Sequence, residues 1–199
     1  ALKETINRAK KDGIKYMLTI STEDKSFEQI LKIVNGYESV YGTYGIHPHE
    51  AKSHQHIKSD DIINKVNQNK KIIGIGETGL DFYYNHSEKK DQIFSFEEHI
   101  SAAQEKNLPL IVHTRSAEKE TLQILEKHSK KKETKILIHC FTGTREFAFK
   151  LLDLGAFISA SGVVTFKKSK DLALIFQDIP NDKILVETDS PYLAPVPLR

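Results

Sequence analysis

Four residues that commonly bind metal ions each end a short apolar run. KIIGIGE ends in Glu77, LPLIVH in His113, KILIH in His139 and KILVETD in Asp189. Apolar, β-branched runs of this length are typical of buried strands. In parallel α/β folds the carboxyl ends of the strands form one rim, and active sites are built on that rim. We therefore expect these four side chains to converge.

The residue types of this set point to a divalent metal. A single histidine or aspartate that closes a strand is usually a capping or hydrogen-bonded structural group. Four such residues on different strands of one sheet favour a site instead. Two imidazoles and two carboxylates make a mixed nitrogen and oxygen ligand set that suits Zn²⁺, Mn²⁺ or, with more water, Mg²⁺.

Other residues expected near the same rim suit a phosphate group. His47 and His49 lie on a turn that contains proline, Arg115 lies two residues past His113, and Thr142 precedes a predicted helix. Each has a structural alternative, namely a loop hydrogen bond for the histidines, a salt bridge for Arg115 and helix capping for Thr142. We predict that these four residues bind substrate.

Two other chemistries are less consistent with the residues. Cys140 is next to His139, but neighbours on a continuing strand point to opposite faces, so we expect Cys140 to be a packing residue rather than a nucleophile. The glycines of GIGETG lack the full dinucleotide-binding pattern, and Glu77 would face a pyrophosphate with the wrong charge.

The elements that must position these residues alternate along the whole chain. Seven apolar runs predict strands, and segments of helical period lie between them. The expected strands are 14–21, 40–46, 71–76, 108–113, 134–139, 156–161 and 183–188. A further helix around Leu2, Ile6 and Ala9 opens the chain, so the predicted order is a helix, six βα units and a last strand.

This order predicts an α/β fold, a TIM-like (β/α) barrel in a single domain over residues 1–199. An eight-fold barrel would need one more strand before Ala1 and one more helix after Arg199. We therefore expect the barrel to lack its first strand and last helix. An open, doubly wound sheet would satisfy the same periodicity.

Composition limits the possible partners. The net charge is only +2, so any nucleic-acid site must be local rather than a consequence of bulk charge. The one cysteine excludes an intramolecular disulfide framework, and no apolar run is long enough to cross a membrane. We expect a cytoplasmic protein with no membrane partner.

Five motifs, in order, resemble the TatD family of metal-dependent hydrolases. They are GIHPHEA, IGIGETGLDFYY, LPLIVHTRSA, HCFTGT and LVETDSPYLAPVPLR, and they extend from Gly45 to Arg199. The resemblance implies an amidohydrolase-like TIM barrel that hydrolyses phosphodiester bonds in DNA, often from the 3′ end of single strands. It also implies that Glu77 bridges two divalent metal ions, that His113 and His139 complete one of them, and that Asp189 ligates the other and handles protons.

The chain departs from the family pattern at its start. TatD relatives carry a His-x-His pair at the end of their first strand, and no such strand precedes Ala1. His47 and His49 have that spacing but belong to a later loop of the family pattern. The resemblance therefore implies one nearly complete metal position and a second that lacks two ligands.

We weigh three functions. The first is a metal-dependent deoxyribonuclease, probed by end-labelled single-stranded DNA. The second is a metal-dependent amide or ester hydrolase, such as an aminoacyl-tRNA deacylase, which would cleave an uncharged ester and not DNA. The third is a relative that binds nucleic acid without turnover, in which binding would survive chelation.

Overall fold

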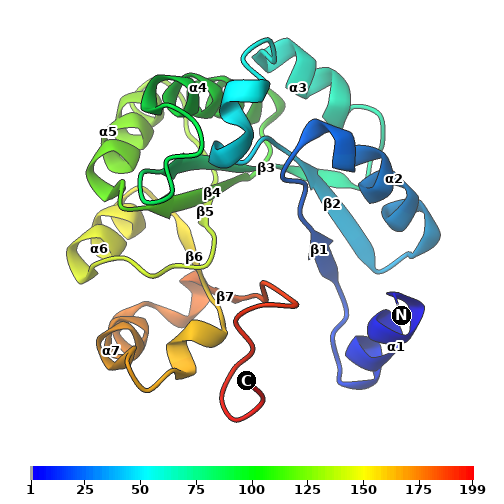
Figure 1. Ribbon diagram of the computed structural model, residues 1–199, viewed down its shortest axis with the longest axis vertical. Coiled ribbons are helices and arrows are strands. Elements are labelled where there is room, and N and C mark those ends of the chain that lie inside the picture. Colours follow the sequence, from blue (N-terminus) through cyan, green and yellow to red (C-terminus); the bar gives the residue numbers. More distant parts are fainter. Residues whose placement is uncertain (1) are drawn as a thin grey trace.

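The computed structural model describes residues 2–199, which form a curled parallel sheet with helices on its outer side (Figure 1). Neighbouring strands are adjacent in the chain, and all six pairs are parallel. The strands are β1 Met17–Thr19, β2 Val40–Tyr44, β3 Ile72–Asp81, β4 Leu110–Arg115, β5 Ile136–Ile138, β6 Phe157–Ala160 and β7 Ile184–Val186.

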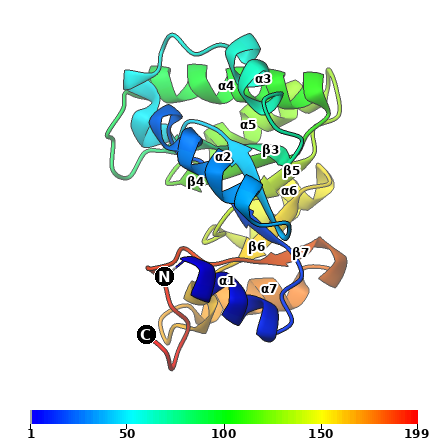
Figure 2. The same ribbon diagram turned by 90° about the vertical axis from the view of Figure 1, so that its right-hand side faces the viewer.

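One helix precedes β1 and one lies in each connection between strands. Their bounds are α1 Leu2–Lys11, α2 Phe27–Gly36, α3 Ser59–Val66, α4 Lys89–Lys106, α5 Glu118–Ser129, α6 Arg145–Asp153 and α7 Lys170–Asp178. Helices α1 and α7 lie at the two open ends of the arc (Figures 1 and 2). Within residues 2–199, no helix combines the length and the apolar character that a membrane crossing requires.

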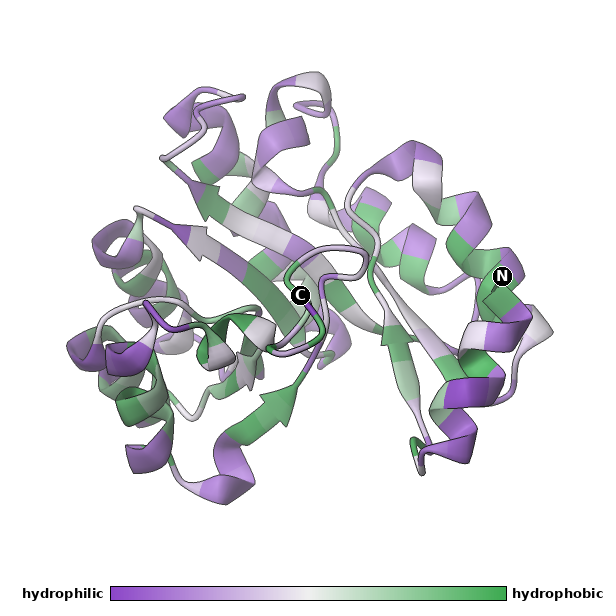
Figure 3. Cartoon of the chain, turned by 60° about the horizontal axis from the view of Figure 1, so that its bottom comes forward, coloured by the Kyte–Doolittle hydropathy of each residue, from purple (hydrophilic) through white to green (hydrophobic). Residues whose placement is uncertain are grey.

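The core lies between the sheet and the helices around it. The helices carry both hydrophobic and hydrophilic residues along their length (Figure 3), as expected for helices that bury only one face. The residues that they bury fully pack against equally buried strand residues. Members of this core include Val34, Ile62, Phe96, Leu125 and Leu151 from the helices, and Ile75, Leu110, Val112, Ile138 and Ile158 from the strands.

The predicted element order and the TIM-like fold class are confirmed. All seven expected strands form in the expected places, and the sheet is a half-barrel. The doubly wound alternative is wrong, because such a sheet reverses its strand order at a switch point, whereas here the order runs from β1 to β7 without reversal.

Strand β3 is longer than expected. We predicted it to end at Gly76, but it continues to Asp81, with a shift in its register against β4 between Ile75 and Thr78. Gly79 has φ +130° and lies against β4, where an added Cβ would be 2.1 Å from the carbonyl oxygen of His113. Only glycine suits both the backbone angle and this close approach.

We expect Gly79→Ala to lower the free energy of unfolding by about 3 kcal/mol or more, since it combines backbone strain with a steric clash. Urea denaturation would measure the change. Gly36→Ala is the matched control, because no neighbouring heavy atom lies within 4 Å of a Cβ at Gly36. Equal stability of Gly79→Ala and the wild-type protein would contradict this account of β3.

His99 of α4 fixes the segment that follows β2. Its Nδ1–H donates to the carbonyl oxygen of Ser95 at 2.7 Å, and its Nε2 accepts from the backbone N–H of Ile46 at 3.0 Å. These two roles require the neutral ring. The ring is 1% exposed, and burial lowers the pKa of His99 to about 4.

This buried histidine predicts an acid-sensitive contribution to stability. As the pH falls below about 6.5, the unfolded chain binds a proton at His99 before the folded chain does. Between pH 7 and pH 4 the free energy of unfolding of the wild-type protein should therefore fall by about 3 kcal/mol relative to that of His99→Gln. Urea denaturation in the presence of a chelator would measure this. Parallel stability curves over this range would contradict it.

Candidate metal centre

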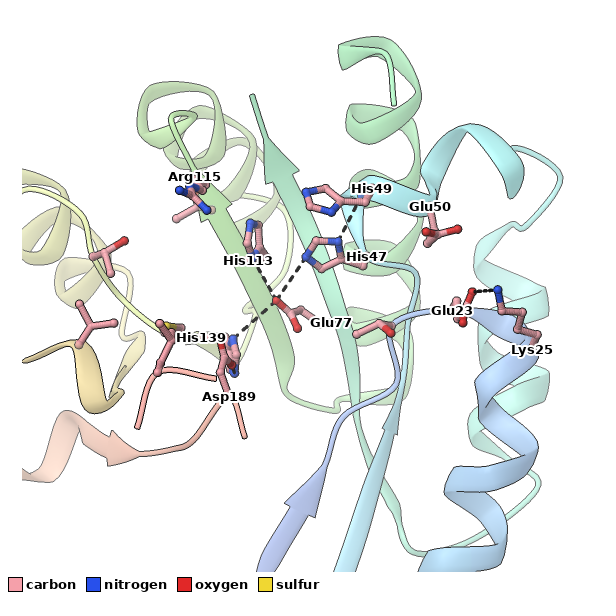
Figure 4. A pocket seen from close by; sticks show the side chains of 16 residues that line it. Glu23, Lys25, His47, His49, Glu50, Glu77, His113, Arg115, His139 and Asp189 are labelled. Carbon is pink, nitrogen blue, oxygen red and sulfur yellow. Dashed lines mark hydrogen bonds and ion pairs between the residues drawn. The ribbon is translucent and has the colours of Figure 1, made fainter. Parts of the chain in front are cut away.

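The predicted ligands come together at the carboxyl ends of the strands. Glu77 lies in β3 and His113 in β4, while His139 and Asp189 lie one and three residues beyond the ends of β5 and β7. All four line a cavity of about 790 Å³ (Figure 4). His47, which follows β2, lines it as well.

Glu77 is at the centre of the cluster. Its Oε1 lies 3.1 Å from His113 Nδ1, 3.6 Å from His139 Nδ1 and 3.7 Å from His47 Nε2. Burial disfavours the charged carboxylate, but the hydrogen bond from His113 and the nearby imidazoles outweigh this effect and lower the pKa of Glu77 to about 2. The site therefore holds a buried carboxylate that is negatively charged at neutral pH.

His113 joins Glu77 to a second buried carboxylate. Its Nε2 lies 3.2 Å from Oδ2 of Asp81, which also lies 2.8 Å from His49 Nε2. Burial lowers the pKa of His113, but the bonds to Asp81 and Glu77 dominate and raise the pKa to about 9. The imidazole is therefore held in place from both of its nitrogens. A histidine that binds a metal uses one ring nitrogen for the ion, and a hydrogen bond at the other nitrogen orients the ring.

A second group of acidic residues surrounds His139. Its Nε2 lies 2.5 Å from Glu187 Oε2 and 3.6 Å from Asp189 Oδ1. Burial, which is opposed by His139 but reinforced by Glu187 and Glu77, raises the pKa of Asp189. The Asp189 side chain is 36% exposed, compared with 9% for Glu77. Asp189 is thus the more accessible carboxylate of the two.

These residues fit divalent cations. Ligand atoms of His47, Glu77 and His113 lie within 4.8 Å of one another, and so do those of His139, Glu187 and Asp189. Both carboxylate oxygens of Glu187 are buried and lack a hydrogen bond of good geometry among the described residues, although one is close to His139. Buried carboxylate oxygens that lack a hydrogen bond are suited to bind a cation.

The residues predicted to bind substrate occupy different places around the cavity. His47 lies among the ligand atoms beside Glu77, and burial lowers its pKa to about 4. His49 faces Asp81. His49, Arg115 and Thr142 all line the cavity. The structural alternative for Arg115 was a salt bridge. Arg115 is an exposed residue instead. It lies over two tyrosine rings.

Two carboxylates of the site escaped the sequence analysis. Asp81 lies beyond the predicted end of β3, and only a longer strand would have carried it to the rim. Glu187 lies two residues before Asp189, and we had placed it inside a strand that in fact ends at Val186. The signal for both was a second acidic residue within four positions of a predicted ligand.

Cys140 differs from the expectation of simple packing. Strand β5 ends at Ile138, and Cys140 adopts φ 45° and lines the cavity. Its thiol donates to Ser161 Oγ at 3.2 Å. Burial raises the pKa of Cys140 to about 12, so the thiolate that a nucleophile requires is scarce at neutral pH.

A parallel half-barrel with imidazole and carboxylate groups clustered at its carboxyl rim is typical of a metal-dependent hydrolase of the TIM-barrel class. The family described as TatD related DNase matches residues 1–199, and the chain belongs to this family.

Relatives in sequence and structure agree with this membership. An uncharacterized metal-dependent hydrolase of Buchnera aphidicola is 38% identical over 100% of this chain and 76% of its own length. The 3′-5′ ssDNA/RNA exonuclease TatD of Salmonella typhimurium is 34% identical over 96% of this chain and 74% of its own. The crystal structure of the TatD homologue YjjV of Escherichia coli has a TM-score of 0.88 at 23% identity, covering 96% of this chain and 73% of that one.

Proposed function

We propose that this hydrolase cleaves phosphodiester bonds of DNA and removes nucleotides from the 3′ ends of single strands. The observation that carries the proposal is the pair of ligand groups on either side of Glu77, since two adjacent cations suit the displacement of one phosphate oxygen by another. The name of the Salmonella relative, an exonuclease acting on single-stranded DNA and RNA, supports the choice of substrate.

We assign four residues to two divalent cations of Mg²⁺, Mn²⁺ or Zn²⁺. Glu77 would contact both, His113 and His139, which both lie beside Glu77, would complete the ligand set of one, and Asp189 would hold the other. When bound, such cations lower the pKa of an attacking water and neutralise charge on the phosphoryl oxygens. The second position keeps fewer ligands on this chain.

The chain itself supplies a proton acceptor. Asp189 combines partial exposure with a raised pKa, so it accepts a proton more readily than the buried Glu77 does. We assign the proton of the attacking water to this carboxylate.

Four residues that line the cavity would hold the phosphate. His47 and His49 stand on the turn after β2 and Arg115 at the end of β4, on one side of Glu77, and Thr142 lies before α6. Arg115 is suited to paired contacts with phosphate oxygens, and Thr142 offers a hydroxyl.

The test is cleavage of single-stranded DNA that is labelled at its 5′ end, with Mg²⁺, Mn²⁺ or Zn²⁺ and with a chelator as control. A ladder of products shortened from the 3′ end, abolished by the chelator, is expected. The same oligonucleotide made of RNA and an uncharged ester test the other substrates. Ester hydrolysis without cleavage of either nucleic acid would overturn the proposal.

A further inference from the structure

Two adjacent tyrosines stand exposed beside the metal centre. Tyr83 is 61% exposed and Tyr84 is 50% exposed, in the turn between β3 and α4. Their ring centroids are 4.9 Å apart, with an edge-to-face arrangement. The ring of His86 is nearly parallel to that of Tyr84, at 11° and a centroid distance of 5.7 Å. The turn therefore presents several aromatic rings to solvent.

Arg115 connects this aromatic turn with the cavity. Its guanidinium carbon lies 4.2 Å from the ring centroid of Tyr83 and 4.6 Å from that of Tyr84. Arg115 also lines the cavity that contains Glu77. A guanidinium that stacks on an aromatic ring keeps its N–H groups available at its edge. A phosphate bound by Arg115 would thus lie next to the exposed rings.

Asp81 fixes the position of the aromatic turn relative to the metal centre. Its Oδ1 accepts from the backbone N–H groups of Tyr83 at 2.9 Å and Tyr84 at 3.0 Å. Its Oδ2 contacts the ligand His113 at 3.2 Å. Gln92 bonds both backbone groups of Asp81 and the carbonyl oxygen of Ser87, so the turn is braced from α4 as well.

Proteins bind single-stranded nucleic acids through aromatic rings that stack on the bases and nearby cationic side chains that contact the phosphates. Each nucleobase has a π-face that can stack on tyrosine, but a base within a duplex is already stacked and paired. We infer that the turn of Tyr83 and Tyr84 binds an unpaired base of the nucleotide next to the scissile phosphate. This inference rests on the function proposed above and assigns the single-strand requirement to named side chains.

Two oligonucleotides that resist cleavage and have the same backbone, one with bases and one without, measure binding of the base separately from cleavage. Fluorescence anisotropy in Mg²⁺ would compare a labelled phosphorothioate hexathymidylate with an abasic phosphorothioate of the same length. The wild-type protein should bind the hexathymidylate on the order of tenfold more tightly. The double variant Tyr83→Ala/Tyr84→Ala should lose this preference, whereas Tyr83→Phe/Tyr84→Phe should keep it.

The matched control is Tyr16→Ala. Tyr16 is 73% exposed and in edge contact with Tyr41, but it precedes β1, at the end of the sheet away from the carboxyl rim. This variant should keep the preference for bases. Equal binding of the two ligands by the wild-type protein, or an unchanged preference in the double alanine variant, would overturn the inference. Failure of the phosphodiesterase proposal would appear separately, as no cleavage of unmodified DNA by the wild-type protein.

Discussion

Glu77→Gln is expected to lower the rate of metal-dependent DNA cleavage by on the order of a thousandfold or more. Residues that only support a metal ligand already change affinity or activity by about 10- to 100-fold, so loss of the central ligand should exceed that range. Glutamine has nearly the same shape but no charge, and three imidazoles around Oε1 would lose their shared carboxylate. Bound metal should therefore fall together with the rate.

Initial rates with end-labelled DNA and the metal content of the purified protein would both be measured for Glu77→Gln. Glu50→Gln provides the control, because Glu50 lines the same cavity and we assign it no role in the reaction. A Glu77→Gln protein that binds and cleaves as the wild type does would refute the assignment of Glu77.

Asp189→Asn should also reduce cleavage by on the order of a thousandfold, but for a different reason. Asparagine can neither accept the proton of the attacking water nor supply a charged ligand oxygen. The cation that we assign to Glu77, His113 and His139 does not use Asp189, so it should stay bound. The expected signature is a large fall in kcat with metal content reduced only in part.

Single-turnover rates at saturating DNA would establish this signature. Asp153→Asn is a suitable control, because it removes the same charge from the exposed end of α6, outside the cavity. If Asp189→Asn lost all bound metal, Asp189 would be a required ligand of both positions, and its separate role as proton acceptor would lose its support.

The sequence alone predicts the order of elements along the chain and the rim that carries the candidate site, because both depend on local patterns. Apolar runs marked all seven strands, and a polar residue after each of four runs marked the rim. The curvature of the sheet depends on packing between distant segments, so the same periodicity also allowed an open, doubly wound sheet. Only the observed order from β1 to β7 decides between them.

The missed carboxylates follow from strand ends that local patterns predict poorly. Gly76 ends the predicted strand and Gly79 lies beyond it, and glycine has low strand propensity, so the continuation of β3 to Asp81 was hidden. The glycines are tolerated because β4 lies too close for side chains there. Similarly, the contact between Glu187 and His139 joins residues 48 positions apart (187 − 139 = 48), which periodicity does not report.

The hydrogen bonds from the turn to Asp81 bear on protein engineering. Asp81 holds residues 83 and 84 by their backbone N–H groups, so these bonds form with any side chain except that of proline, which has no N–H. A mutant library that varies positions 83 and 84 would change the rings in front of the cavity while leaving the ligand histidines in place. Libraries that change the length of the turn would instead displace the N–H groups that bond to Asp81. Selection for new substrates should therefore start from side-chain diversity at these two positions.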